Sequence, residues 1–195
     1  MNTTIERKIT SEGFSYTISC DPTLEGTTNF TLSLLPIHIT VVECDTNIYQ
    51  MKEANWLLKL ISWIPIPIWN RLMPFKYYLN GSLLGKSKTT LFRPAFFFPI
   101  GADVYEIRGH SKNYYSMMKN DVQVALIQRE TYVYHERNTY QIKFKEDCCP
   151  KPILLLLCIF IDTKFYPNQG SIFTNRWDTD YVINDLYEDR VLWKP

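Results

Sequence analysis

Basic side chains gather in one stretch of the chain, between residues 93 and 119. Their types suit anion binding, because guanidinium and ammonium groups donate charge-assisted hydrogen bonds to phosphate and carboxylate oxygens. The stretch contains Arg93, Arg108, His110, Lys112 and Lys119. If the fold brings them together, they form a site for a lipid phosphate or an acidic partner, to which Arg108 and Lys112 should contribute most. The alternative is that they are solvated, outward positions of alternating strands.

The other reactive residue types give no pattern of a catalytic or metal site. His38, His110 and His135 fall on different expected strands or loops, and no two have the helical spacing of metal ligands. No glycine-rich phosphate loop, nucleophile elbow or Cys-His pair of recognisable spacing is present. The acidic residues near the C-terminus lack the spaced oxygen ligands of a calcium loop. We therefore predict a protein that is not an enzyme and has no metal site or cofactor.

The cysteines and the N-terminus indicate the cellular compartment. The chain has 5 cysteines, an odd number, without the paired two-residue spacings of zinc and redox sites. Reduced thiols in a cytosolic protein fit this pattern, although the adjacent Cys148 and Cys149 leave open a soft-metal site or a strained disulfide. Residues 1–10 lack the apolar run of a signal peptide. We expect a cytoplasmic protein, peripheral to the membrane if it binds lipid.

Composition limits the class of protein and its partners. A chain of 195 residues with 46% hydrophobic and 21% charged residues can form one domain with a packed core. The net charge of +1 provides no broad field that would attract nucleic acid, so we expect no nucleic-acid partner. Any charged site must therefore be local.

Strand patterns account for most of the chain. Tyr140, Ile142 and Phe144 alternate with polar residues, which is the period of a strand with one buried face. Asn80-Gly81 suits a tight type I′ hairpin turn, and Glu25-Gly26 suits a turn between two earlier strands. The expected strands cover 14–20, 30–34, 37–44, 47–51, 77–79, 83–86, 89–98, 104–108, 114–118, 123–129 and 140–145. Short strands at this spacing indicate a barrel or sandwich.

Two apolar segments interrupt the strand pattern. The first, 52–73, carries Trp56, Trp63 and Trp69 and is expected to be helical until Pro65 and Pro67 stop it. It is too short and broken to span a bilayer. Its tryptophans suit a membrane interface or a protein partner, and the alternative is a helical excursion that covers one end of a barrel.

The second apolar segment runs from Ile153 to Ile161 without a polar residue. A helix that is apolar all round must be buried on every side. Nine residues rise only about 14 Å as a helix, whereas a bilayer core is about 30 Å thick. The segment is therefore a core element and not a membrane anchor. Together with the strands it predicts a mainly β (α+β) fold, a closed antiparallel barrel around a buried apolar C-terminal helix.

Short motifs in this order resemble a known family. They are Leu83–Lys86 after the Asn-Gly turn, Phe92–Pro94, Tyr105–Ile107 with Tyr114–Lys119, and Ile153–Asp162. In these motifs the chain resembles the tubby-like superfamily, which includes the plant LURP-one-related proteins, the phospholipid scramblases and small bacterial tubby C-terminal-like proteins. The resemblance implies a roughly twelve-stranded antiparallel barrel that encloses an apolar C-terminal helix.

The resemblance also frames the expected domains and function. It covers residues 14–165, with 52–73 as an excursion, and leaves 1–13 as an N-terminal tail and 166–195 as an aromatic and acidic extension. In eukaryotic tubby proteins basic residues on the barrel surface bind phosphoinositide headgroups, but that site does not map residue by residue onto this chain. We expect a non-enzymatic binding module for anionic membrane-lipid headgroups. The alternative is a protein-interaction domain that uses the extension or the Trp-rich segment.

Overall fold

The computed structural model describes residues 1–29, 37–44, 46–54, 74–89, 95–110, 114–130 and 139–165. These residues form thirteen strands and one helix. The strands are β1 (Asn2–Ile9), β2 (Gly13–Ile18), β3 (Asp21–Asn29), β4 (His38–Glu43), β5 (Asn47–Glu53), β6 (Phe75–Leu79), β7 (Ser82–Lys86), β8 (Lys88–Thr89), β9 (Ala95–Ile100), β10 (Asp103–His110), β11 (Tyr114–Lys119), β12 (Val122–Glu130) and β13 (Thr139–Phe144), and the helix is α3 (Lys151–Phe165).

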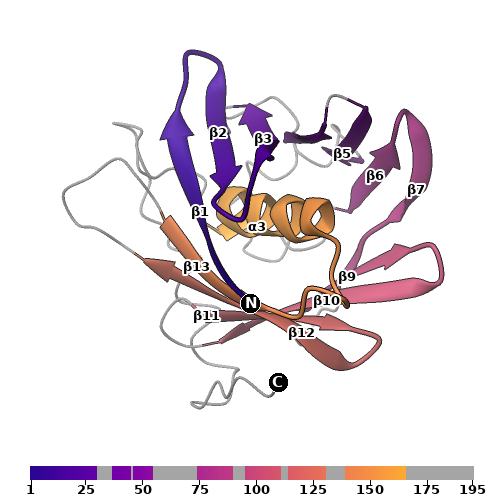
Figure 1. The fold of residues 1–195 in the computed structure, drawn as a ribbon. Coiled ribbons are helices and arrows are strands. Elements are labelled where there is room, and N and C mark those ends of the chain that lie inside the picture. Colours follow the sequence, from indigo (N-terminus) through magenta and orange to yellow (C-terminus); the bar gives the residue numbers. More distant parts are fainter. Residues whose placement is uncertain are drawn as a thin grey trace, which may run out of the picture.

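All strands belong to one antiparallel sheet that curls around the helix. The strand order is β7-β6-β5-β4-β3-β2-β1-β13-β12-β11-β10-β9-β8, so nearly all neighbours in space are also neighbours in sequence. Figure 1 shows the sheet wrapping around α3 as a nearly closed barrel. The prediction of a mainly β fold, an antiparallel barrel with one C-terminal helix, is confirmed.

The helix fills the centre of the barrel. Every residue from Ile153 to Ile161 is 5% exposed or less. The Phe160 ring makes edge contacts with Phe75, Phe96 and Phe98, with ring centroids 5.1, 5.0 and 5.0 Å away. Such aromatic pairs add about 0.5–1.5 kcal/mol each beyond their buried area. The side chains of α3 therefore form the centre of the hydrophobic core, and the strands pack around them.

The first residues of the chain form a strand, so the expected N-terminal tail at 1–13 is wrong. Strand β1 pairs with β2 on one side and with β13 on the other. Ile5 is fully buried, and Arg7 is 2% exposed, whereas Glu6 and Lys8 face solvent. The alternation of apolar and polar residues that identifies a strand is hard to recognise in β1, because the charged Arg7 occupies an inward position where an apolar residue is expected.

The expected turn at Glu25-Gly26 is also wrong, because both residues lie inside β3. The turn between β2 and β3 falls at Ser19 and Cys20. Gly26 faces the helix, and a Cβ at this position would overlap the Ile159 Cδ1 atom and lie 3.4 Å from Leu155 Cδ2. Glycine is present here to let α3 approach the sheet closely and not to make a turn.

The hairpin turn predicted from the Asn80-Gly81 pair is confirmed, and a second turn of the same kind follows β11. Asn80 and Gly81, between β6 and β7, have φ angles of 49° and 80°. Asn120 and Asp121, between β11 and β12, have φ angles of 49° and 66°. Two consecutive positive φ angles define the type I′ turn that matches the twist of paired strands.

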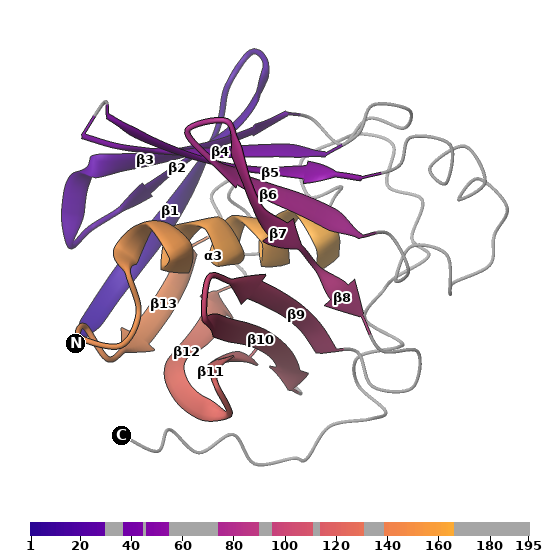
Figure 2. The ribbon, with the colours of Figure 1, turned by 90° about the vertical axis from the view of Figure 1, so that its right-hand side faces the viewer.

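A seam remains where the two ends of the sheet meet. The order ends at β7 and at the two-residue strand β8, and β7 runs beside β9 without a backbone ladder (Figure 2). The Tyr77 hydroxyl donates a hydrogen bond to the Pro99 carbonyl across this gap. Opposite Tyr77, a Cβ at Gly85 would overlap the Tyr77 hydroxyl and lie 2.7 Å from Pro99 O. A tyrosine side chain thus joins strands that the backbone leaves unpaired.

Candidate functional site

The predicted basic residues lie partly on two neighbouring strands, β10 and β11. Arg108 and His110 are on the outer face of β10, because Ile107 and Gly109, which alternate with them, are buried toward the core. Lys119 ends β11 and is paired in register with the inward Tyr105, over whose ring its Nζ lies, so it does not share the outer face of Arg108. Arg93 and Lys112 lie outside the described residues, as do Trp56, Trp63, Trp69, the expected strand at 30–34 and the extension 166–195.

Carboxylates already neutralise two of these cations. Arg108 Nη2 lies 2.5 Å from Glu106 Oε2 and 3.7 Å from Asp121 Oδ1. Lys119 Nζ lies 2.8 Å from Asp103 Oδ2, and this hydrogen bond raises the pKa of Lys119. An anionic ligand at either cation would have to displace carboxylates that the protein itself supplies.

His110 takes part in a polar cluster on the same face. Its Nε2 lies 2.8 Å from Ser116 Oγ, and Gln123 Nε2 donates to the same Oγ at 2.9 Å. Because Gln123 supplies a hydrogen to Oγ, the serine hydroxyl can donate to the histidine. This resembles a nucleophile and its base, but Ser116 is only 4% exposed, which keeps substrates away from Oγ. The cluster is better suited to linking three strands than to catalysis.

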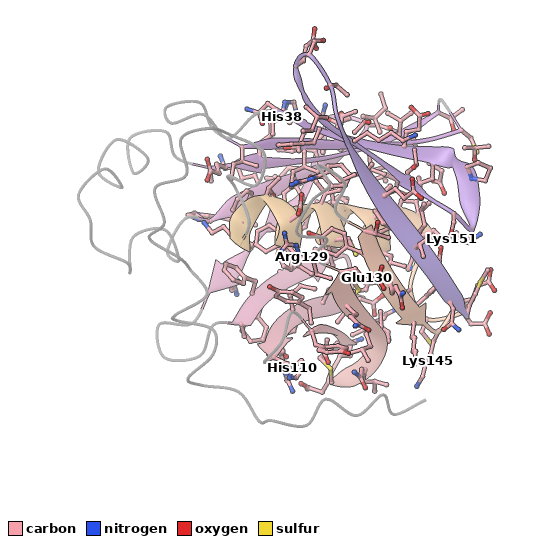
Figure 3. All side chains as sticks on the ribbon, turned by 90° about the vertical axis from the view of Figure 1, so that its left-hand side faces the viewer. His38, His110, Arg129, Glu130, Lys145 and Lys151 are labelled. Carbon is pink, nitrogen blue, oxygen red and sulfur yellow. The ribbon has the colours of Figure 1, made fainter. Side chains whose placement is uncertain are left out.

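Strand pairing reveals a second set of basic residues, on β4 to β7. Their positions follow one another in register: His38 opposes Lys52, Lys52 opposes Lys76, and Lys76 opposes Lys86. All four alternate with residues that face the barrel interior, such as Ile39, so they lie on the outer face. We name these four residues the basic row. In Figure 3, His38 and His110 lie on opposite sides of the barrel, so the basic row is separate from the β10–β11 face.

Among the described residues, the lysines of the basic row have no acidic partner. In the part of the chain that the structure describes, no carboxylate lies within ion-pair distance of Lys52, Lys76 or Lys86. Lys52 Nζ lies 5.6 Å from the centroid of the Tyr78 ring. Burial and the nearby Lys52 both lower the pKa of His38. Like charges directly opposite each other on neighbouring strands destabilise a sheet, so the row concentrates positive charge at an energetic cost.

Sequence reasoning missed the basic row because its members are distant along the chain. They are separated by 14, 24 and 10 positions (38 to 52, 52 to 76 and 76 to 86), which looks like no cluster. The register that unites them depends on the length of each strand and on a bulge between Tyr77 and Tyr78. From the sequence one could predict only that each lysine points outward from its own strand. The alignment of the lysines across the four strands could not be predicted.

A buried polar cluster ties α3 to the barrel wall. The Asp162 carboxylate accepts hydrogen bonds from Arg7 Nη1 at 2.9 Å, from the Tyr16 hydroxyl at 2.6 Å and from the Tyr140 hydroxyl. Arg7 and Asp162 are 2% and 1% exposed. Burial, and then the Asp162 charge, raise the pKa of Tyr16 and Tyr140 well above the ordinary value. Both hydroxyls therefore stay protonated and serve as donors, so the cluster holds the helix in place.

The thiols are poorly suited to chemistry. Burial raises the pKa of Cys149 to about 12 and that of Cys158 well above its ordinary value. Both are thus uncharged near neutral pH, whereas reaction and metal binding need the thiolate. Within the described ranges, no group of three or more His, Cys, Asp or Glu side chains is placed to hold a metal ion.

The described part of the chain has no helix of the length and apolar character needed to cross a membrane. No protein-family model, curated protein or solved structure matches the chain. The function must therefore be argued from the chemistry of the two outer faces and of the filled interior.

Proposed function

We propose that the protein is a non-enzymatic binding module of the tubby-like type that docks on anionic membrane-lipid headgroups. The basic row on β4–β7 carries this proposal, because its lysines lie on an outer face of the barrel and have no carboxylate partner within the described ranges. A Lys or Arg near an anionic membrane surface contributes about 1 kcal/mol of binding. Several lysines that act together would thus give measurable peripheral binding.

The filled interior favours an external ligand. Ligand-binding barrels hold small molecules in an open centre, but here α3 occupies that space with residues that are almost fully buried. The inward polar groups Arg7, Tyr16 and Tyr140 are already engaged by Asp162. Binding is therefore expected on the outside of the sheet.

The Trp-rich segment starts and ends beside the basic row. Ala54 N donates to the Pro74 carbonyl at 2.9 Å, which brings together the two ends of the connection between β5 and β6. Lys52 and Lys76 are each two residues from these ends. The intervening residues 55–73 lie outside the described part, but their sequence carries Trp56, Trp63 and Trp69. Tryptophan is enriched at membrane interfaces, so the residue types of this segment agree with a lipid surface.

The test is co-sedimentation of the purified full-length chain with liposomes. One set contains only phosphatidylcholine, and the other contains phosphatidylcholine with 30% phosphatidylserine. We expect sedimentation with the anionic vesicles alone, which weakens as salt rises because salt screens the attraction. Failure to bind the anionic vesicles at low salt would overturn the proposal and favour a protein partner.

A further inference from the structure

We infer that the basic row is the docking surface itself, and that it responds to the charge density of an anionic bilayer instead of enclosing one particular headgroup. This inference rests on the proposed function, since it requires that the protein binds anionic lipid. Beyond the proposed function, the inference specifies the surface that binds, predicts contact with several lipids at once, and explains why the identity of the headgroup has little effect.

The dimensions of the row indicate contact with several lipids. Its members occupy one register position on four consecutive strands, β4 to β7. Neighbouring strands lie about 4.8 Å apart, so the backbone positions of the row extend over about 14 Å. A pocket for one phosphate needs donors that converge on one point. Cations spread along a line on an outer sheet face instead meet separate phosphates.

The repulsion between these cations gives the row its preference for a charged surface. Lys76 directly opposes Lys52 on one side and Lys86 on the other, and each of these pairs of like charges is unfavourable in the free protein. An anionic surface placed over the row relieves all of these repulsions together. Binding should therefore rise steeply with the anionic lipid fraction.

Apolar side chains on the same face favour a bilayer over a dissolved polyanion. Leu83 on β7 is 60% exposed and lies opposite Tyr78, which is outward on β6. Ile48 on β5 is 39% exposed and lies opposite Val42. Lysines beside exposed aromatic and aliphatic side chains match an interface where phosphates border hydrocarbon. A soluble phosphate or nucleic acid would gain nothing from these apolar groups.

The opposite face of the barrel provides the contrast. Arg108 has both Glu106 and Asp121 as partners, so the outer face of β10 has more acidic than basic groups in these contacts. Docking through that face would bring carboxylates against an anionic surface. The two faces therefore predict opposite outcomes for matched charge substitutions.

The experiment compares three full-length variants with the unchanged protein. The first carries Lys52→Gln, Lys76→Gln and Lys86→Gln in the basic row. The matched control carries Lys8→Gln, Lys143→Gln and Lys145→Gln, which remove the same charge from the outer face of β1 and β13 and from the residue that follows β13. A third carries Arg108→Gln and Lys119→Gln. Thermal unfolding and circular dichroism check that each variant is folded.

Three lysines at about 1 kcal/mol each, with a tenfold change per 1.4 kcal/mol, predict a loss of about 100-fold in the partition coefficient of the row variant on phosphatidylserine vesicles. The control and the β10–β11 variant should lose far less. If the unchanged protein binds and the row variant binds equally well, the docking surface lies elsewhere and this inference fails while the proposed function stands. If the unchanged protein does not bind, the proposed function itself fails.

The headgroup is tested at constant charge. Vesicles with equal fractions of phosphatidylserine or phosphatidylglycerol should bind the unchanged protein within about threefold of each other, since both carry one negative charge per lipid. Free phosphoserine at matched ionic strength should not compete. A strong preference for one headgroup, or competition by phosphoserine, would contradict the charge-density mechanism and indicate a pocket for one headgroup.

Discussion

Asp162 is an ionisable residue within a helix that is otherwise apolar over most of its length, and it faces three donors at once. Arg7 supplies the compensating charge, while Tyr16 and Tyr140 supply neutral hydroxyls. Burial tends to lower the pKa of Arg7, but the Asp162 charge and the neighbouring tyrosines outweigh it, so that pKa is raised and Arg7 stays charged. A buried pair of this kind fixes one orientation and depth of the helix, because no other rotation of α3 would satisfy the charge of Arg7.

We predict that Asp162→Ala lowers the free energy of unfolding by about 3–5 kcal/mol, because it removes the carboxylate that accepts hydrogen bonds from the buried Arg7, Tyr16 and Tyr140. Urea unfolding followed by tryptophan fluorescence measures the change. The double variant Arg7→Leu, Asp162→Leu should recover part of the loss, since it removes both charges. An unchanged urea midpoint for Asp162→Ala would show that the cluster contributes no stability.

At the scale of elements, local signals identified the hairpins and the buried helix, whereas tertiary contacts decided the rest. Asn80-Gly81 needs no distant partner to form its turn, so the sequence sufficed. Gly26 is a residue type typical of turns, but in this fold it lets α3 pack closely against β3. That role depends on Ile159, which lies 133 positions later (159 − 26). The basic row and the Asp162 cluster could not be predicted for the same reason. Their residues are far apart in the sequence and come together only through the tertiary arrangement of the strands.

The packing role of Gly26 gives a second stability prediction. Gly26→Val should lower the free energy of unfolding by about 1–3 kcal/mol, because the added side chain overpacks the contact with Ile159. The control is Thr27→Val, which places the same residue on the outer face of the same strand. Thermal unfolding of both variants measures the effect. Equal midpoints for the two variants would contradict the close approach of α3 and β3.

For the whole molecule, the seam between β7 and β9 is where the barrel is joined most weakly. Every other neighbouring pair of strands shares a backbone ladder, whereas at this seam the Tyr77 side chain of β6 reaches past Gly85 of β7 to the Pro99 carbonyl of β9. Burial raises the pKa of Tyr77 to about 12, so its hydroxyl remains a donor throughout the neutral range. The seam also borders Lys86, the last member of the basic row.

Removing this one hydroxyl should loosen the seam without unfolding the barrel. Tyr77→Phe is expected to cost about 0.5–1.5 kcal/mol and to speed amide hydrogen exchange in β7 and β9, while exchange in β2 and β3 stays unchanged. Tyr78→Phe, which removes a hydroxyl from the outer face of the same strand, is the control. Equal exchange in the two variants would mean that the Tyr77 hydrogen bond does not hold the seam.

The position of α3 in the chain has a consequence for how the protein is made. The helix is the last described element in sequence, yet strands as early as β1 and β2 depend on Asp162 through Arg7 and Tyr16. At about 5–20 residues per second, roughly 10–30 s separate the synthesis of β1 from that of the helix. During that time the inner face of every finished strand has no core to cover it. The nascent chain therefore depends on chaperones, or on separation from other chains, until α3 leaves the ribosome. A ribosome that stalls before α3 would leave an aggregation-prone sheet.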